Sequence, residues 1–210
     1  MNFICPTITA GDPHEYRRQM EKVAPFSQRL HIDIMDGQLA PTISLPINSL
    51  WWPDNLLVDI HVMFQRPGDY LDQLIKLNPS LVIIHDEADV DTDEVTNILH
   101  ENHIKAGLAI LPDTLAEAIL TKAKAFDHLL VFGGHLGYHG GRADLSQLTK
   151  VSQLRANYPD KEIGWDGGLN LDNCRQIAQA GANVLNVGSY IHSADDPKEA
   201  YAKLESAVNT

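Results

Sequence analysis

Residues 81–110 read LVIIHDEADVDTDEVTNILHENHIKAGLAI. The first run, LVIIH, is short, apolar and rich in branched residues, which is typical of a buried strand. After a polar turn, DTDEVTNILHE (91–101) places apolar side chains at helical spacing behind an aspartate that suits a helix N-cap. A second apolar run, IKAGLAI (104–110), completes a strand–helix–strand unit. Such a unit predicts parallel strands in an α/β protein.

The same alternation extends along the chain in both directions. Further strands are predicted at 2–7, 29–35, 56–63, 128–132, 162–165 and 183–187. Further helices are predicted at 13–24, 68–77, 113–123, 144–158, 171–181 and 195–208, and only a short helix fits at 44–52. Eight strands alternating with helices in 210 residues favour a single closed (β/α)8 barrel, the TIM barrel, as one domain spanning residues 1–210. An open doubly wound sheet is disfavoured because no dinucleotide fingerprint follows the first strand.

Composition and charge narrow the classes of partner. The chain has 16 basic and 28 acidic residues and a formal net charge of −12, which disfavours nucleic acid or an anionic membrane as a general partner. No segment approaches the roughly 20 apolar residues of a membrane span, and no signal sequence is evident. Cys5 and Cys174 form no spaced metal or redox motif, so two buried, reduced thiols are expected. We expect a cytoplasmic protein that forms a homo-oligomer.

Residues of metal-ligating type stand at the ends of several predicted strands. His31 and Asp33 share one face of their strand, because alternate side chains point the same way. His61 lies near the end of the next strand, and Asp166 directly follows the seventh. Taken singly, each residue has a simpler explanation as a core group or a turn former. Barrel strands end at one mouth, however, so we expect the four to converge and to bind one divalent ion such as zinc, iron, manganese or cobalt.

Six motifs resemble, in order, those of the ribulose-phosphate 3-epimerase family: HIDIMDG, DIHVM, HDEA, KAGLAI, WDGGLN and NVGSYI. The resemblance covers nearly the whole chain. It implies a phosphate-binding (β/α)8 barrel that interconverts D-ribulose 5-phosphate and D-xylulose 5-phosphate, while related members epimerise allulose 6-phosphate at the same carbon. It also implies that His31, Asp33, His61 and Asp166 are metal ligands and that Asp33 and Asp166 are the catalytic acid/base pair. Epimerisation removes a proton from one face of a carbon and returns one to the other, which explains two carboxylates.

The resemblance further implies a set of substrate-contacting residues. Thr7 stands where the family usually has a serine, and it keeps the hydroxyl. Glycine turns after the last three strands would hold phosphate through backbone N–H groups. Met35 and Met63 match methionines that line the family's site, with Phe132 in the place of a third, although core packing explains all three equally well. The substrate-binding residues expected are Thr7, His61, Gly140, Gly141, Gly167, Gly168, Gly188 and Ser189.

The loop after the sixth strand departs from the family. Relatives read roughly NPGFGGQ, whereas this chain reads HLGYHGGRAD (135–144), with His139 as an insertion. Arg142 is an additional substrate-binding candidate because a guanidinium can bind phosphate bidentately, but a solvated arginine at a helix start fits equally well.

Three other residues, His85, Glu87 and His128, are not assigned as ligands or catalytic groups. His85 is expected to lie near the mouth and to support the site without ligating the metal. The acidic run behind it, which includes Glu87, is interpreted as a solvated loop and helix start. His128 is interpreted as an ordinary surface histidine.

The predicted barrel is compatible with three classes of function. The first is a metal-dependent 3-epimerase acting on a pentulose or hexulose phosphate. The second is a lyase or decarboxylase of the phosphate-barrel type, whose third strand carries D-x-K-x-x-D; here that strand reads DIHVMF (59–64) and lacks the lysine. The third is a non-catalytic sugar-phosphate-binding barrel. The epimerase is favoured because a binding protein has no need of two opposed acid/base groups.

Overall fold

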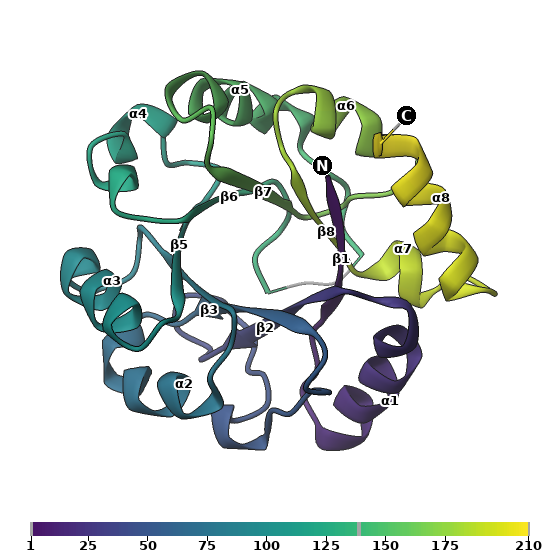
Figure 1. Ribbon diagram of the computed structural model, residues 1–210, viewed down its shortest axis with the longest axis horizontal. Coiled ribbons are helices and arrows are strands. Elements are labelled where there is room, and N and C mark those ends of the chain that lie inside the picture. Colours follow the sequence, from purple (N-terminus) through teal and green to yellow (C-terminus); the bar gives the residue numbers. More distant parts are fainter. Residues whose placement is uncertain (1, 138–139, 210) are drawn as a thin grey trace.

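Eight parallel strands close on themselves in the computed structural model, which describes residues 2–137 and 140–209. Neighbouring strands pair in sequence order, and β1 pairs with β8 to complete the barrel. The helices form an outer ring around the strands (Figure 1). The strands are β1 (Phe3–Ile8), β2 (Arg29–Met35), β3 (Leu57–Met63), β4 (Leu81–His85), β5 (Lys105–Ile110), β6 (His128–Phe132), β7 (Glu162–Asp166) and β8 (Val184–Val187). The predicted (β/α)8 fold is confirmed.

The helices differ from the expected ones mainly in length. They are α1 (Pro13–Val23), α2 (Leu71–Leu77), α3 (Thr92–Glu101), α4 (Ala116–Ile119), α5 (Leu148–Asn157), α6 (Cys174–Gln179), α7 (Ser189–His192) and α8 (Pro197–Asn209). Short 3-10 turns lie at Ala24–Phe26, Ile47–Ser49, Pro67–Tyr70, Lys122–Lys124 and Leu145–Gln147. The helix predicted at 113–123 is divided into α4 and a 3-10 turn, and the one at 44–52 is a single 3-10 turn. The four-residue α7 is too short for a periodic pattern to reveal.

Local chemistry explains where two of the helices begin. The side chain of Asp12 accepts hydrogen bonds from the backbone N–H groups of His14 and Glu15 at the start of α1. Asp91 accepts from Asp93 and Glu94 in the same way at the start of α3. Each aspartate satisfies N–H groups that have no partner inside the helix, as the sequence pattern predicts.

Strand alternation places polar side chains inside the barrel. On β2, Leu30, Ile32 and Ile34 are buried in the large apolar core shared with the helices, so His31 and Asp33 point to the barrel axis. Parallel register then aligns Asp33 with His61 on β3. Among the described residues, no helix has the length and apolar character needed to span a bilayer. Both cysteines are free and buried, as expected.

A second group of charged side chains lies inside the barrel near the starts of the strands, and we call it the basal cluster (Arg29, Asp59, His128 and Glu162). Arg29 Nε donates to Asp59 Oδ2 at 2.8 Å, and its two terminal nitrogens donate to the Glu162 carboxylate at 3.0 and 2.8 Å. His128 Nδ1 lies 3.2 Å from the same carboxylate. His128 is fully buried, so its interpretation as a surface histidine was wrong. It is the first residue of β6 and points inward beside a charged partner.

Candidate metal centre and active site

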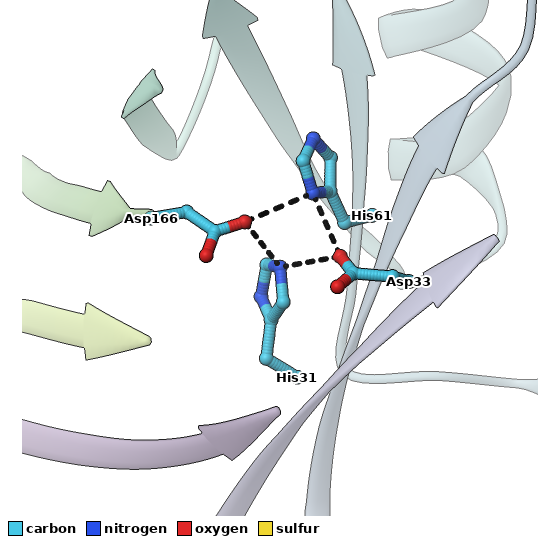
Figure 2. A group of neighbouring side chains, drawn as sticks. All are labelled: His31, Asp33, His61 and Asp166. Atoms are coloured by element: carbon cyan, nitrogen blue, oxygen red, sulfur yellow. Dashed lines mark hydrogen bonds and ion pairs between the residues drawn. The ribbon is translucent and has the colours of Figure 1, made fainter. Parts of the chain in front are cut away.

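The four predicted ligands meet inside the barrel where β2, β3 and β7 end, and we call them the apical cluster (His31, Asp33, His61 and Asp166). Figure 2 shows their donor atoms in a closed ring. His31 Nε2 lies 3.3 Å from Asp33 Oδ1 and 3.6 Å from Asp166 Oδ2. His61 Nδ1 lies 3.0 and 3.5 Å from the same two oxygens. Two imidazole nitrogens and two carboxylate oxygens therefore face one point.

The spacing of these atoms fits a single metal ion. Ligands about 2.0–2.2 Å from one ion, at angles between square and tetrahedral, lie roughly 2.8–3.6 Å from their neighbours. The four neighbouring distances of the apical cluster run from 3.0 to 3.6 Å, and all four donors lie within 4.8 Å of one another. Mixed nitrogen and oxygen donors suit zinc, iron, manganese or cobalt. The apical cluster could thus hold one divalent ion.

The electrostatics of the apical cluster favour uptake of positive charge. Burial alone lowers the pKa of an imidazole, but contact with Asp166 and Asp33 outweighs burial and raises the pKa of His31 to about 10. The same balance raises the pKa of His61. Burial raises the pKa of a carboxyl group, yet the two histidines hold the pKa values of Asp33 and Asp166 below their usual range. The carboxylates stay ionised and attract either protons or a cation.

A hydroxyl group holds the second oxygen of Asp33. Thr9 Oγ1 donates to Asp33 Oδ2 at 2.6 Å, so the other oxygen is left to face the two imidazoles. Gln19 fixes Thr9 in turn, because its side chain accepts from Thr9 N and donates to Thr9 O. Sequence reasoning missed Thr9, although it stands two residues after Thr7 and so shares its direction.

A second set of contacts lies behind His61. Its Nε2 is 2.8 Å from His85 Nε2, and His85 Nδ1 is 3.3 Å from Glu87 Oε2. His85 is fully buried and contacts His61, so it lies near the mouth as expected. Glu87 is also partly buried, so its interpretation as part of a solvated loop was wrong. Burial raises its pKa, but hydrogen bonds with His85, Thr114 and Leu111 prevail and lower that pKa to about 2.

An open cavity borders the apical cluster at Asp33 and Asp166. The predicted site residues that line it are Thr7, Asp33, Met35, Met63, Phe132, Gly140, Gly141, Asp166, Gly167, Gly168, Gly188 and Ser189. Sequence reasoning missed Thr9, Gly134, His135, Gly137, Leu169 and Asn186, which line it as well. Carboxylates, hydroxyls, apolar side chains and glycine backbone thus surround one space.

Two buried polar atoms in the lining have no hydrogen-bond partner within the described structure. They are Thr7 Oγ1 and Asn186 Oδ1. A buried polar atom without a partner is costly, so both atoms are suited to a polar ligand or an ordered water in the cavity. Asn186 lies on β8, where a polar residue between the buried Leu185 and Val187 was the signal that could have found it.

Glycine is required where the loops after β6 and β7 meet. Gly167 has φ +114°, and a Cβ there would lie 2.3 Å from Gly134 N. Gly168 has φ +65°, and its Cβ would lie 2.1 Å from Ala143 N. Any larger residue would separate the two loops. This close approach places the glycine turns together at the cavity, where backbone N–H groups can face an anion.

Three predicted site residues do not line the cavity. His31 and His61 are fully buried in the apical cluster. Arg142 is exposed and is not among the lining residues. The insertion at His139 lies outside the described residues. Asp36 Oδ1 accepts from Gln38 N and Leu39 N, which shapes the turn after β2.

Comparison with known proteins adds independent evidence about the chain. A family model described as the ribulose-phosphate 3 epimerase family matches residues 3–192. A protein named ribulose-phosphate 3-epimerase from Schizosaccharomyces pombe is 32% identical over 213 residues, which is 98% of this chain and 93% of the relative. One of the same name from Mycobacterium bovis is 32% identical over 211 residues, or 96% of this chain and 91% of that protein.

Solved structures show the same fold at low identity. The 3-hexulose-6-phosphate synthase from Salmonella typhimurium has a TM-score of 0.77 at 17% identity and covers 98% of both chains. The phosphoribosyl anthranilate isomerase from Thermococcus kodakaraensis has a TM-score of 0.70 at 12% identity and covers 100% of both chains. At these identities the likeness supports the barrel architecture alone.

Proposed function

The chain belongs to the ribulose-phosphate 3-epimerase family, a family of carbohydrate isomerases, and we propose that it epimerises D-ribulose 5-phosphate and D-xylulose 5-phosphate at C3 with one divalent metal ion. The observation that carries this proposal is the convergence of two ionised aspartates, Asp33 and Asp166, on one cavity beside two buried imidazoles.

The two aspartates perform the proton transfers in this proposal. They come from β2 and β7, strands that are not neighbours in the barrel, so they reach the reacting carbon from different sides. One carboxylate removes the C3 proton, and the other, protonated, delivers a proton to the opposite face; the roles exchange in the reverse direction. Thr9 keeps Asp33 in a fixed orientation through its hydrogen bond to Oδ2.

The metal ligands in this proposal are His31, Asp33, His61 and Asp166. A divalent ion bound there would supply positive charge that stabilises the enediolate formed when the C3 proton leaves. The chain contributes the fixed donor positions and the burial that strengthens electrostatic interactions at the site. The choice among zinc, iron, manganese and cobalt is decided by metal analysis of the purified protein.

The remaining lining residues bind and enclose the substrate in this proposal. Thr7 Oγ1 offers a hydrogen bond to a sugar oxygen, because it has no partner among the described residues. Backbone N–H groups at Gly140, Gly141, Gly167, Gly168, Gly188 and Ser189 bind the phosphate. Met35, Met63 and Phe132 form an apolar wall that excludes water from the reacting carbon. The predictions of a cytoplasmic location and a homo-oligomer stay predictions.

A panel of sugars tests the proposal. Metal-loaded protein is incubated separately with D-ribulose 5-phosphate, D-allulose 6-phosphate and free D-ribulose, and products are followed by NMR. We expect epimerisation at C3, the largest kcat/KM for the pentulose phosphate, and much weaker turnover of the free sugar. Preference for the allulose ester would identify a hexulose phosphate epimerase. Equal kcat/KM for phosphorylated and free ribulose would contradict a phosphate ester as substrate, and no turnover of any sugar would favour a binding protein.

A further inference from the structure

His61 uses only one of its two ring nitrogens in the apical cluster. Nδ1 faces Asp33 and Asp166, while Nε2 points away from both carboxylates (Figure 2). A neutral imidazole carries a proton on one nitrogen and a lone pair on the other. Binding a metal through Nδ1 therefore requires the proton to be on Nε2, and whatever contacts Nε2 influences the choice.

The contact at Nε2 is the first of a chain of hydrogen bonds that ends on a carboxylate. His61 Nε2 lies 2.8 Å from His85 Nε2, and His85 Nδ1 lies 3.3 Å from Glu87 Oε2. The other oxygen of Glu87 accepts from the backbone N–H of Leu111 at 2.9 Å and from the Thr114 hydroxyl. The chain thus runs from the end of β3, across β4, to the loop after β5.

When His61 is neutral, as metal binding through Nδ1 requires, one arrangement of protons satisfies the contacts from its Nε2 to Glu87. The Leu111 N–H can only donate, and an ionised carboxylate can only accept, so Glu87 accepts from both directions. His85 must then carry its proton on Nδ1, which leaves a lone pair on Nε2. His61 Nε2 must donate to that lone pair, and its own lone pair is left on Nδ1. The carboxylate of Glu87 thereby leaves the lone pair of His61 on Nδ1, the nitrogen that faces the apical cluster.

We propose that His85 and Glu87 are positioning residues for the metal centre, which hold His61 in the tautomer whose Nδ1 can bind the ion. The proposal rests on the proposed metal site, since His61 needs that tautomer only as a ligand. Partners behind a ligating histidine commonly fix its tautomer and orientation. Here the fixing carboxylate is separated from the ligand by a second imidazole.

The substitution Glu87→Gln tests in which direction the hydrogen bonds between His61, His85 and Glu87 run. The two side chains have nearly the same shape, but the amide has one acceptor and one donor. Its oxygen is retained by the Leu111 N–H, so its NH2 group faces His85 Nδ1. His85 must then accept there and donate from Nε2, which forces the proton of His61 onto Nδ1. We expect zinc affinity to fall roughly 10- to 100-fold.

The experiment measures zinc affinity by competition with a chromophoric chelator for the unmodified chain, Glu87→Gln and Asp89→Asn. Asp89 is an exposed carboxylate in the same loop, so its variant makes the same change of charge away from His85. The tautomer of His85 is read in metal-free protein from imidazole 15N shifts and long-range couplings. We expect the Nδ1–H form in the unmodified chain and in Asp89→Asn, and the Nε2–H form in Glu87→Gln. A loss of packing alone would not exchange the two tautomers.

We call the hydrogen bonds that connect His61, His85 and Glu87 the relay. The possible outcomes distinguish failure of the relay from failure of the metal site. Equal zinc affinity in Glu87→Gln and the unmodified chain, or an Nε2–H tautomer of His85 in the unmodified chain, would overturn the relay and leave the metal site standing. Failure of the unmodified chain to bind zinc, iron, manganese or cobalt would overturn the metal site and the relay together. Equal losses in Glu87→Gln and Asp89→Asn would assign the effect to loop charge and would also overturn the relay.

Discussion

Three strands contribute to both of two clusters of charged residues, and the clusters differ in what completes them. β2 contributes Arg29 to the basal cluster and Asp33 to the apical one. β3 contributes Asp59 and His61, and β7 contributes Glu162 and Asp166. The basal cluster includes a guanidinium that pairs with both of its carboxylates. The apical cluster has two carboxylates and no permanently charged cation.

This difference indicates a structural role for the basal cluster and a chemical role for the apical cluster. Burial lowers the pKa of Arg29, but Asp59 and Glu162 outweigh burial and raise it, so the basal carboxylates have their counter-ion within the chain. In the apical cluster the two carboxylates need a proton or a metal ion from outside the chain to balance their charge. In barrels of this kind, catalysis is found where the strands end and stability is served where they begin. The comparison predicts distinct responses to mutation, pH and metal.

The largest effect is expected on catalysis at the apical end. Asp33→Asn or Asp166→Asn removes one acid/base group while nearly preserving shape, so kcat should fall by roughly 10³-fold or more. Steady-state kinetics with D-ribulose 5-phosphate measures the loss, and circular dichroism verifies that the barrel is folded. Turnover within tenfold of the unmodified chain in both variants would disprove the two-base scheme.

The next effect is expected on stability at the basal end. Arg29→Met removes the guanidinium from the buried Asp59 and the partly buried Glu162, which should lower the free energy of unfolding by about 3–5 kcal/mol. As a control, Lys203→Met breaks the exposed ion pair with Glu199 and should change it by less than about 1 kcal/mol. Urea denaturation gives both values. Similar changes in the two variants would show that the basal cluster does not stabilise the barrel.

The two ends should also respond oppositely to pH. In metal-free protein the raised pKa of His31, about 10 against an ordinary 6.5, makes the native state hold the extra proton between those values. Stability should therefore fall as pH rises from about 6.5 to 10. At the basal end burial lowers the pKa of His128, and for Glu162 contact with His128 and Arg29 outweighs burial and lowers its pKa too. There the unfolded state binds more protons, so stability should fall as pH drops below about 6.5 and further below 4.5.

Urea denaturation between pH 4 and 10, with and without zinc, measures both limbs of this pH dependence, the fall in stability at alkaline pH and the fall at acidic pH. Zinc should remove the alkaline limb, because a ligating His31 carries no extra proton to lose, and it should leave the acid limb in place. An alkaline limb that persists unchanged in zinc would argue against His31 as a ligand.

The smallest effect is expected at the edge of the apical site. Arg142 is exposed and does not line the cavity, so Arg142→Ala should change KM by less than about twofold and leave kcat unchanged. Initial rates over a range of D-ribulose 5-phosphate concentrations decide the question. A roughly ten- to hundredfold rise in KM, the size expected for one lost charge-assisted contact, would show that Arg142 binds phosphate after all.

Sequence predicted those features that depend on periodicity. Short apolar runs gave the strands nearly to the residue, and the alternation of His31 with Asp33 placed both at one mouth. Features made by loop contacts were missed. Glu87 lies in an acidic run that resembles a solvated loop, and only the approach of Leu111 after β5 makes it a partly buried acceptor. His128 begins a strand, and the parallel pairing of β6 with β7 brings it to Glu162.

The central claim is that the apical cluster is completed by a metal ion and then moves the C3 proton. The most direct test follows exchange of that proton with D2O by NMR, using D-ribulose 5-phosphate with protein stripped of metal and with the same protein after metal is restored. We predict that exchange stops in the stripped protein and returns with about one equivalent of a divalent ion per chain. Undiminished exchange in the presence of excess chelator, with no metal detected on the protein, would contradict the claim.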